Sequence, residues 1–282
     1  MTSKMKFSGK LGILFILGLL FVHPTIYAQE SDFALPQNEN LLSSLWNDAK
    51  YVGHETFSPE HNQWWKVLTY AGFAGMLYFG SDLEVHEEYG MEKEYNPSSI
   101  PKYFGDIGNL YDNPGTLYFT AGLLGTFYGS GKVFNNDKLQ ETTVLMIRSL
   151  LITGLATSVL KVAIGRERPY VNGNSNEYKP FSFDPDYMSM PSGHSSSIFA
   201  MMTVIAKQYD EWYIKVPAYA FAASVTAQRI NTDKHWSSDV LIGSTIGYLI
   251  GSAIVKRYHY KDRYFDVQPT VSPRGLGLNI QF

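Results

Sequence analysis

The chain contains no cysteine, so disulfide bonds and thiol chemistry are excluded. Charged residues are also scarce, at 17% of the chain, and the acidic residues (26) slightly outnumber lysine and arginine (23). A formal net charge of −3 argues against nucleic acid as a partner, because proteins that bind phosphate backbones carry an excess of positive charge. Without disulfides, an exported protein of this composition must be stabilised by its core alone.

Long hydrophobic runs are missing as well. The longest, Leu11–Val22, has 12 residues, fewer than the roughly twenty that a membrane-spanning helix needs. It follows Lys4, Lys6 and Lys10 and precedes the small residue Ala28, which is the pattern of a secretory signal peptide. We therefore expect cleavage near residue 28 and export to the cell envelope, with an uncleaved signal anchor as the alternative. Cleavage removes three lysines and no acid, which lowers the net charge from −3 to −6.

Several apolar segments have the length and the Gly, Ala and Ser content of closely packed helices. These segments are Trp64–Gly80, Thr116–Phe134, Thr143–Ile164, Ser195–Ala206, Tyr213–Gln228 and Asp239–Val255. They predict an all-α fold, a helical bundle of about six core helices. Alternating hydrophobic residues on both sides of a turn at 272–275 predict a short C-terminal β-hairpin. The expected divisions are a signal peptide (1–28), a polar and amphipathic segment (29–62), a helical domain (63–260) and the hairpin (261–282).

Three separate motifs carry the candidate chemistry, and the first begins at Lys161. Arg168 stands seven residues later and is followed by Pro169. This spacing predicts one helix that carries both cations on the same face and ends at the proline. Two cations on one face repel each other unless an anion lies between them, so the motif indicates a phosphate site. A helix end with dipole-favoured basic residues is the alternative.

The second motif is Pro191-Ser192-Gly193-His194, which precedes an apolar run and predicts a helix start. Free N–H groups and the positive end of the dipole bind anions there, and Gly193 lets the backbone approach closely. Ser192 can add a hydroxyl, and His194 can exchange a proton with a bound group. An ordinary capped helix with a surface histidine is the alternative.

The third motif places Arg229 six residues before His235 and Asp239 four residues after it. The spacing of four predicts that His235 and Asp239 share a helical face, with Arg229 near the start of the helix. An aspartate behind an imidazole orients the ring and stabilises the cation that forms when the ring attacks. A surface salt bridge is the alternative for the pair alone.

Together, Lys-x6-Arg-Pro, Pro-Ser-Gly-His and Arg-x5-His-x3-Asp resemble the motifs of the type 2 phosphatidic acid phosphatase family. This family is grouped with bacterial acid phosphatases and vanadium haloperoxidases. The resemblance covers roughly Glu141 to Arg257. It departs at one position, because Gln228 stands where the family usually has serine.

The resemblance implies that His235 attacks phosphorus and forms a phosphohistidine, while Asp239 holds the ring. His194 would protonate the leaving oxygen and then activate the water that releases phosphate. The residues that bind the phosphate oxygens would be Lys161, Arg168, Ser192, Gly193 and Arg229. No metal and no other cofactor is expected, and vanadate would act as a phosphate mimic and inhibitor.

The motifs do not identify the substrate, because a phosphorylated lipid, a prenyl pyrophosphate and a soluble phosphomonoester present the same terminal group. The loop 170–190 either sets this preference or is a surface loop anchored by buried aromatics. Its aromatic residues are Tyr178, Phe181, Phe183 and Tyr187. The alternative functions are a vanadate-dependent haloperoxidase and a non-catalytic envelope phosphate-binding protein. The oligomeric state is not predicted.

The location of the bundle depends on its hydropathy. A mean hydropathy of −0.14 favours a periplasmic bundle, soluble or attached to a membrane surface, over integral topology as the alternative. One acidic segment, 82–88, combines carboxylates with His86 but lacks metal-ligand spacing, so a solvated segment is predicted there.

Overall fold

The computed structural model describes residues 40–57, 64–80, 82–89, 100–259, 266–272 and 275–281. Most of them are helical, which confirms the all-α class. The predicted signal peptide lies outside the described residues. The helices are α2 (Leu41–Phe57), α3 (Trp64–Gly80), α4 (Asp82–Tyr89), α5 (Ile100–Asp112), α6 (Thr116–Val133), α7 (Asp137–Ile164), α8 (Pro169–Asn172), η2 (Pro185–Tyr187), α9 (Gly193–Gln208), α10 (Trp212–Asn231) and α11 (Ser237–His259).

Two strands follow the helices in the chain. Strand β1 (Asp266–Ser272) pairs antiparallel with β2 (Gly275–Gln281). The register runs from Asp266 opposite Gln281 to Ser272 opposite Gly275.

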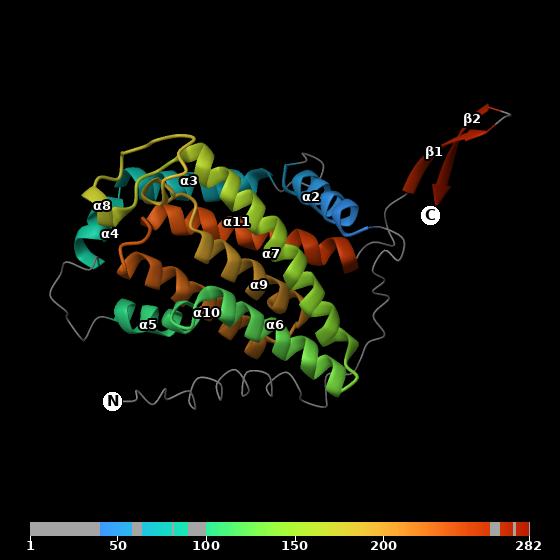
Figure 1. The fold of residues 1–282 in the computed structure, drawn as a ribbon, viewed down its shortest axis with the longest axis horizontal. Helices are drawn as coiled ribbons and strands as arrows, with labels where there is room; N and C mark the ends of the chain where they lie inside the picture. Colours follow the sequence, from blue (N-terminus) through green and yellow to red (C-terminus); the bar gives the residue numbers. More distant parts are fainter. Residues whose placement is uncertain are drawn as a thin grey trace.

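Helix α9 is the centre of the bundle (Figure 1) and packs against α7, α10 and α11. Its apolar residues surround it on nearly every side, which is typical of a fully buried helix. Met201, Val204 and Ile205 belong to the hydrophobic core. All six apolar segments predicted to be helical are helices.

Three glycines allow α11 to approach α9 closely. Gly243, Gly247 and Gly251 are four residues apart, and a Cβ atom at each would collide with backbone atoms at the start or along the length of α9. The contact places the first turns of both helices side by side, with the Ser192 amide donating to the Asp239 carbonyl oxygen at 3.0 Å. This packing brings the second and third motifs together.

We expect Gly247→Ala to destabilise the protein, because the new methyl group would meet the Ser196 carbonyl oxygen and the Ala200 amide. Backbone atoms cannot turn away as a flexible side chain can, so the cost is roughly 1–3 kcal/mol or more. Gly154→Ala is the matched control, since no atom lies within 4 Å of its Cβ position. Denaturant unfolding should show a lower midpoint for Gly247→Ala and an unchanged or higher one for Gly154→Ala. Equal midpoints would contradict the close packing.

Helix α2 is attached to the bundle through a buried carboxylate. Asp48 is fully buried and lies 2.6 Å from Arg148 Nη1 and 3.1 Å from Arg257 Nε. The Tyr258 hydroxyl also donates to it at 3.1 Å. Two arginines compensate the cost of burying this charge, so the network joins α2 to α7 and α11.

Two of the described helices, α7 and α11, are long and apolar enough to cross a membrane. A core helix of a soluble protein passes the same test, and 61% of the most apolar window of α11 is buried in the bundle. For α7 the buried share is only 39%. Its outward side carries an exposed stripe at intervals of four residues, formed by Ile147, Leu151, Leu155 and Val159.

Candidate active site

Lys161 and Arg168 lie on opposite sides of a turn, so the prediction of one continuous helix is wrong. Helix α7 ends at Ile164, because Gly165 adopts a left-handed φ of 61°. Arg168 is instead the N-cap of α8. The chain nevertheless returns both cations to one point, where Lys161 Nζ donates to the Met188 carbonyl oxygen at 2.5 Å and Arg168 Nη2 donates to the same oxygen at 3.3 Å.

Backbone hydrogen bonds hold the loop between the first two motifs. The Lys179 amide donates to the Gly165 carbonyl at 2.6 Å, and the Phe181 amide donates to the Val162 carbonyl at 2.7 Å. Phe181 and Phe183 point outward, with 76% and 79% of their surface exposed. The alternative that buried aromatic residues anchor the loop is therefore wrong for these two residues.

The other two aromatic residues of the loop have different surroundings. Tyr178 is 39% exposed, and its backbone forms an isolated antiparallel bridge with Arg166. Tyr187 ends the short helix η2, and the Lys179 ammonium lies 5.4 Å from its ring centre. A role for the four aromatics in substrate preference stays a prediction.

The second motif begins α9, as predicted. Ser192 is the N-cap, and its hydroxyl accepts from the Ser195 amide. His194 lies in the first turn, with Nε2 at 2.9 Å from Thr116 Oγ1 and 3.2 Å from an Asp112 carboxylate oxygen. Both of these partners come from segments that the motifs do not include.

Arg229 lies in the last turn of α10, not near a helix start as predicted. Its Nη2 is 2.6 Å from Asp112 Oδ2, and its Nε donates to Gln228 Oε1 at 2.6 Å. The Gln228 amide in turn donates to Asn109 Oδ1 at 3.0 Å. The residue that departs from the family pattern thus orients the arginine through a hydrogen bond.

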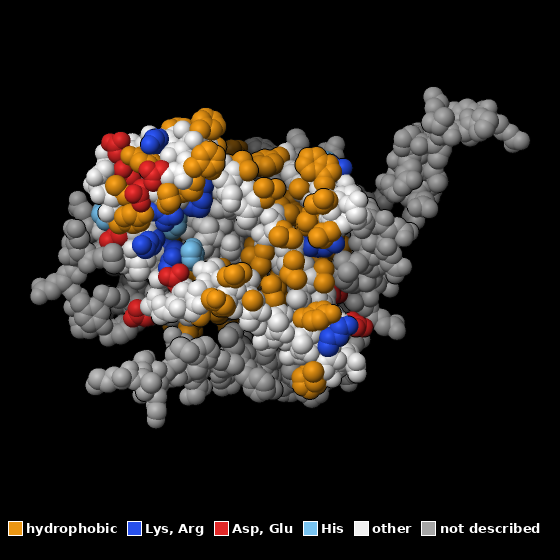
Figure 2. All heavy atoms as spheres, in the orientation of Figure 1, with side chains coloured by type: hydrophobic (Ala, Val, Ile, Leu, Met, Phe, Trp, Pro, Cys, Tyr) orange, Lys and Arg blue, Asp and Glu red, His pale blue; other side chains and the backbone are white. Residues whose placement is uncertain are grey.

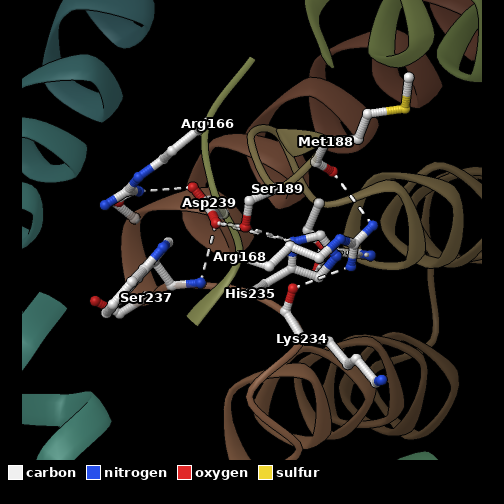
Figure 3. Close-up of polar contacts among 12 residues, drawn as sticks. Arg166, Arg168, Met188, Ser189, Lys234, His235, Ser237 and Asp239 are labelled. Carbon is white, nitrogen blue, oxygen red and sulfur yellow. Dashed lines mark hydrogen bonds and ion pairs between the residues drawn. The ribbon is translucent and has the colours of Figure 1, made fainter. Parts of the chain in front are cut away.

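His235 and Asp239 do not share a helical face, because α11 begins at Ser237 and His235 precedes it. The distance from His235 Nδ1 to Asp239 Oδ2 is 3.8 Å. Ser189 Oγ lies 3.5 Å from Nδ1 and donates to Oδ2 at 2.5 Å, so Asp239 acts on the ring by its charge and through this hydroxyl (Figure 3). Because Nδ1 faces Asp239, Nε2 would be the nitrogen that makes the predicted attack.

Asp239 has a second partner that the sequence analysis missed. Arg166 is fully buried, and its guanidinium donates to Asp239 Oδ1 at 2.7 Å and to Asp82 Oδ2 at 2.8 Å. Asp82 is only 1% exposed, so the prediction of a solvated acidic segment is wrong at this residue. His86 of the same segment lies 3.0 Å from Asp233. These contacts join positions far apart in the chain, and no local pattern marks them.

Further contacts link the three motifs into one site. A Cβ atom on Gly193 would lie 3.6 Å from Lys161 Cε. Arg168 Nη1 donates to the Lys234 carbonyl oxygen at 3.1 Å. The amide of the next residue, His235, donates to the Arg229 carbonyl oxygen at 3.3 Å. In Figure 2, lysine, arginine and histidine side chains gather on one part of the surface, bordered by hydrophobic side chains. The structure thus brings all eight predicted catalytic and phosphate-binding residues together.

Burial favours the neutral form of both histidines. It lowers the pKa of His235 to about 3, and the charges of Lys161 and Arg168 act in the same direction. Burial and then the charge of Arg229 lower the pKa of His194 to about 4, against the opposing effect of Asp112. A neutral His235 has the free electron pair that a nucleophile needs.

Asp112 is ionised in this arrangement. Partial burial opposes its charge, but the hydrogen bond and charge of Arg229 outweigh burial and lower the pKa of the carboxyl group. The carboxylate therefore pairs with the arginine that is predicted to bind a phosphate oxygen, and it favours the protonated form of His194.

Comparison with curated proteins finds relatives that act on lipid A. The chain is 39% identical to the lipid A 1-phosphatase of Porphyromonas gingivalis over 66 residues. This match covers 22% of this chain and 15% of that protein. It is 31% identical to the lipid A 1-phosphatase of Rhizobium etli over 107 residues, and this match covers 36% of this chain and 44% of that protein. The chain therefore spans less than half of the length of these two relatives.

The fold also has a solved counterpart. The crystal structure of a transmembrane PAP2-type phosphatidylglycerolphosphate phosphatase from Bacillus subtilis matches with a TM-score of 0.50 at 18% identity, over 70% of this chain and 96% of that one. This likeness shows a shared fold. The family model of the PAP2 superfamily matches residues 142–263, which hold all three motifs. Over this segment, which is less than half of its length, the chain is similar to the PAP2 superfamily.

Proposed function

We propose that this protein is a phosphatase that removes a terminal phosphate through a phosphohistidine intermediate. The observation that carries the proposal is the convergence of Lys161, Arg168 and Arg229 on His235 and His194. Three cations held this close together favour an anion between them. A phosphate dianion is the ligand that such a site binds best.

In the first step, Nε2 of His235 attacks phosphorus in line with the bond to the leaving oxygen. An N–P bond forms, the P–O bond breaks, and a protonated His194 gives its proton to the leaving oxygen. The three cations stabilise the non-bridging oxygens, while Asp239 stabilises the positive charge that develops on the ring of His235.

In the second step, water attacks the phosphohistidine. His194, now neutral, accepts a proton from the water, the N–P bond breaks, and inorganic phosphate leaves the site. His235 returns to its neutral form and His194 to its protonated form. The side-chain cations supply the positive charge that each step requires, so the mechanism needs no metal ion.

We propose a phosphorylated lipid as the substrate and a membrane surface as the place of action. The outward stripe of α7 and the two exposed phenylalanines of the loop, Phe181 and Phe183, are apolar. Such surfaces next to a cationic site suit an amphiphilic molecule. The lipid A 1-phosphatase relatives support this choice. Export to the cell envelope, argued from residues 1–28, belongs to the same proposal.

Phosphate release in the presence of EDTA tests this function. The purified protein is assayed with lipid A, phosphatidate, undecaprenyl pyrophosphate and p-nitrophenyl phosphate side by side. We expect EDTA-resistant release that is faster from lipids than from the soluble ester. Faster release from the soluble ester would contradict the lipid substrate, and no release from any of them would contradict the phosphatase. Bromide oxidation with added vanadate would instead support the haloperoxidase.

The acidity of His194 should appear in the pH profile. The fraction of protonated His194 falls as the pH rises through its pKa, so kcat/KM for a substrate with a poor leaving group should decline on a limb below the ordinary histidine value of about 6.5. The Asp112 charge raises the pKa of His194. Asp112→Asn should therefore move this limb to lower pH.

Steady-state kinetics between pH 3 and pH 8, roughly the range where histidines titrate in proteins, check this expectation. Asp106→Asn is the control, because Asp106 lies exposed on the same helix and its side chain accepts a hydrogen bond from Asn109. A limb that stays in place in Asp112→Asn would show that Asp112 does not set the acidity of His194.

A further inference from the structure

A buried ion network lies behind the site, and the mechanism above uses it only at Asp239. Nη1 of Arg166 donates to Asp239 Oδ1 at 2.7 Å and to Ser238 Oγ at 2.8 Å. Nη2 donates to Asp82 Oδ2 at 2.8 Å and to the Ser175 carbonyl at 3.0 Å, and Nε donates to the same carbonyl at 3.1 Å. Every N–H group of this guanidinium thus has an acceptor, which fixes its plane.

Asp82 is the acceptor for the first turn of α11. Its Oδ1 accepts from Ser237 Oγ at 2.5 Å and from the Ser238 amide at 2.9 Å. Its Oδ2 accepts from Ser238 Oγ at 2.6 Å, in addition to Arg166. The negative charge therefore lies at the positive end of the α11 dipole. A residue at the start of α4 thus anchors the turn that carries Asp239.

The charges of the network favour a cation at His235. Two carboxylates and one guanidinium leave a formal charge of −1. Without Asp82, Arg166 would neutralise Asp239, and this charge would be zero. The imidazole becomes positive as it attacks phosphorus, so a negative charge behind it stabilises the transition state.

We propose that Asp82 and Arg166 are positioning residues for the reaction at His235, and that they act by holding Asp239 in place and keeping the network negative. The inference rests on the proposed phosphatase function. Neither residue acts on the substrate directly, because Arg166 bonds Oδ1 of Asp239, while the Ser189 hydroxyl and the Trp236 amide bond Oδ2, the oxygen nearer to the ring. Phosphate binding should therefore be independent of them.

Asp82→Asn tests the proposal, because it removes the charge while nearly preserving the shape. We expect kcat to fall roughly tenfold to a hundredfold, the range seen when outer hydrogen-bond partners of a site are lost. KM and the inhibition constant of inorganic phosphate should change little. Asp82→Glu, which restores the charge, should recover part of the lost kcat. A wild-type kcat in Asp82→Asn would overturn the proposal, and so would an equal weakening of phosphate binding.

Asp48→Asn is the matched control. Asp48 is equally buried, but its partners are Arg148, Arg257 and Tyr258, which belong to a different network. Its substitution should lower stability and leave kcat unchanged. An equal loss of kcat in both variants would show a general structural effect and would overturn the positioning role.

A second variant keeps the proposal testable if Asp82→Asn does not fold. Ser238→Ala removes the hydroxyl that lies between Asp82 and Arg166, with Ser44→Ala as the control beside Arg148. Ser238→Ala should lower kcat without raising KM, and an unchanged kcat would overturn the proposal. Wild-type protein assayed in parallel distinguishes failure of the phosphatase function from failure of the positioning role. Absence of wild-type turnover overturns the phosphatase itself, whereas normal turnover in both the wild type and the variants overturns only the positioning role.

Discussion

Replacement of His235 by alanine is expected to abolish phosphate release and phosphoenzyme formation together. The imidazole is the nucleophile of the proposed mechanism, and His194, the other histidine of the site, acts there as the proton donor. Loss of a nucleophile leaves only binding and electrostatic effects, so turnover should fall by roughly 10⁴-fold or more. Phosphate release and alkaline-quench trapping of labelled phosphoenzyme measure both quantities.

His259→Ala is the control for this experiment. His259 ends α11 and contacts Gln208 Oε1 at 2.7 Å and Glu141 Oε1 at 3.4 Å, in a cluster separate from the site. Its variant should keep wild-type turnover and the same trapped phosphoenzyme. A folded His235→Ala protein that retained turnover, or that still trapped phosphate, would exclude His235 as the nucleophile.

Replacement of His194 by alanine should have the second largest effect, and the effect should depend on the leaving group. A lipid alkoxide is a poor leaving group and needs a proton, whereas p-nitrophenolate needs little help. We expect a loss of roughly 10²–10⁴-fold in kcat/KM on lipid substrates and a clearly smaller loss on p-nitrophenyl phosphate. Parallel kinetics on both substrates give the ratio.

Thr116→Val is the companion variant, because it removes the hydroxyl 2.9 Å from His194 Nε2 and leaves the ring in place. It should cost much less than His194→Ala on the lipid. If His194→Ala slowed both substrates by the same factor, the residue would act in binding or in structure, and its role as the proton donor would be wrong.

The residues of the three motifs could be predicted from sequence, but their local geometry could not. The sequence predicted one helix from Lys161 to Arg168, although Gly165 stands between them as a visible signal for a helix end. His235 and Asp239 have helical spacing, but one of them precedes the helix. Spacing alone therefore identified the residues of the site. Their contacts depend on the backbone conformation between them, which spacing does not predict.

Other parts of the site were missed for two different reasons. Helix α5 was overlooked although apolar residues recur every three or four positions from Phe104 through Ile107 to Leu110 and Tyr111, so a signal was available. Asp112, the last residue of α5, was therefore not predicted as part of the site. Asp82 is different, because its burial depends on contacts with α11 and Arg166 that only the tertiary fold creates. No single-sequence pattern identifies a carboxylate of that kind.

The left-handed turn at Gly165 sets the spacing of two charges. On a continuous helix, seven residues would hold Lys161 and Arg168 roughly 10 Å apart along a rigid rod. Here the lysine belongs to the long helix α7, whereas the arginine belongs to the loop that returns from it. Backbone hydrogen bonds from Lys179 and Phe181 hold the loop against the end of α7. The turn therefore lets two cations from different elements reach the same carbonyl oxygen, which a continuous helix could not achieve.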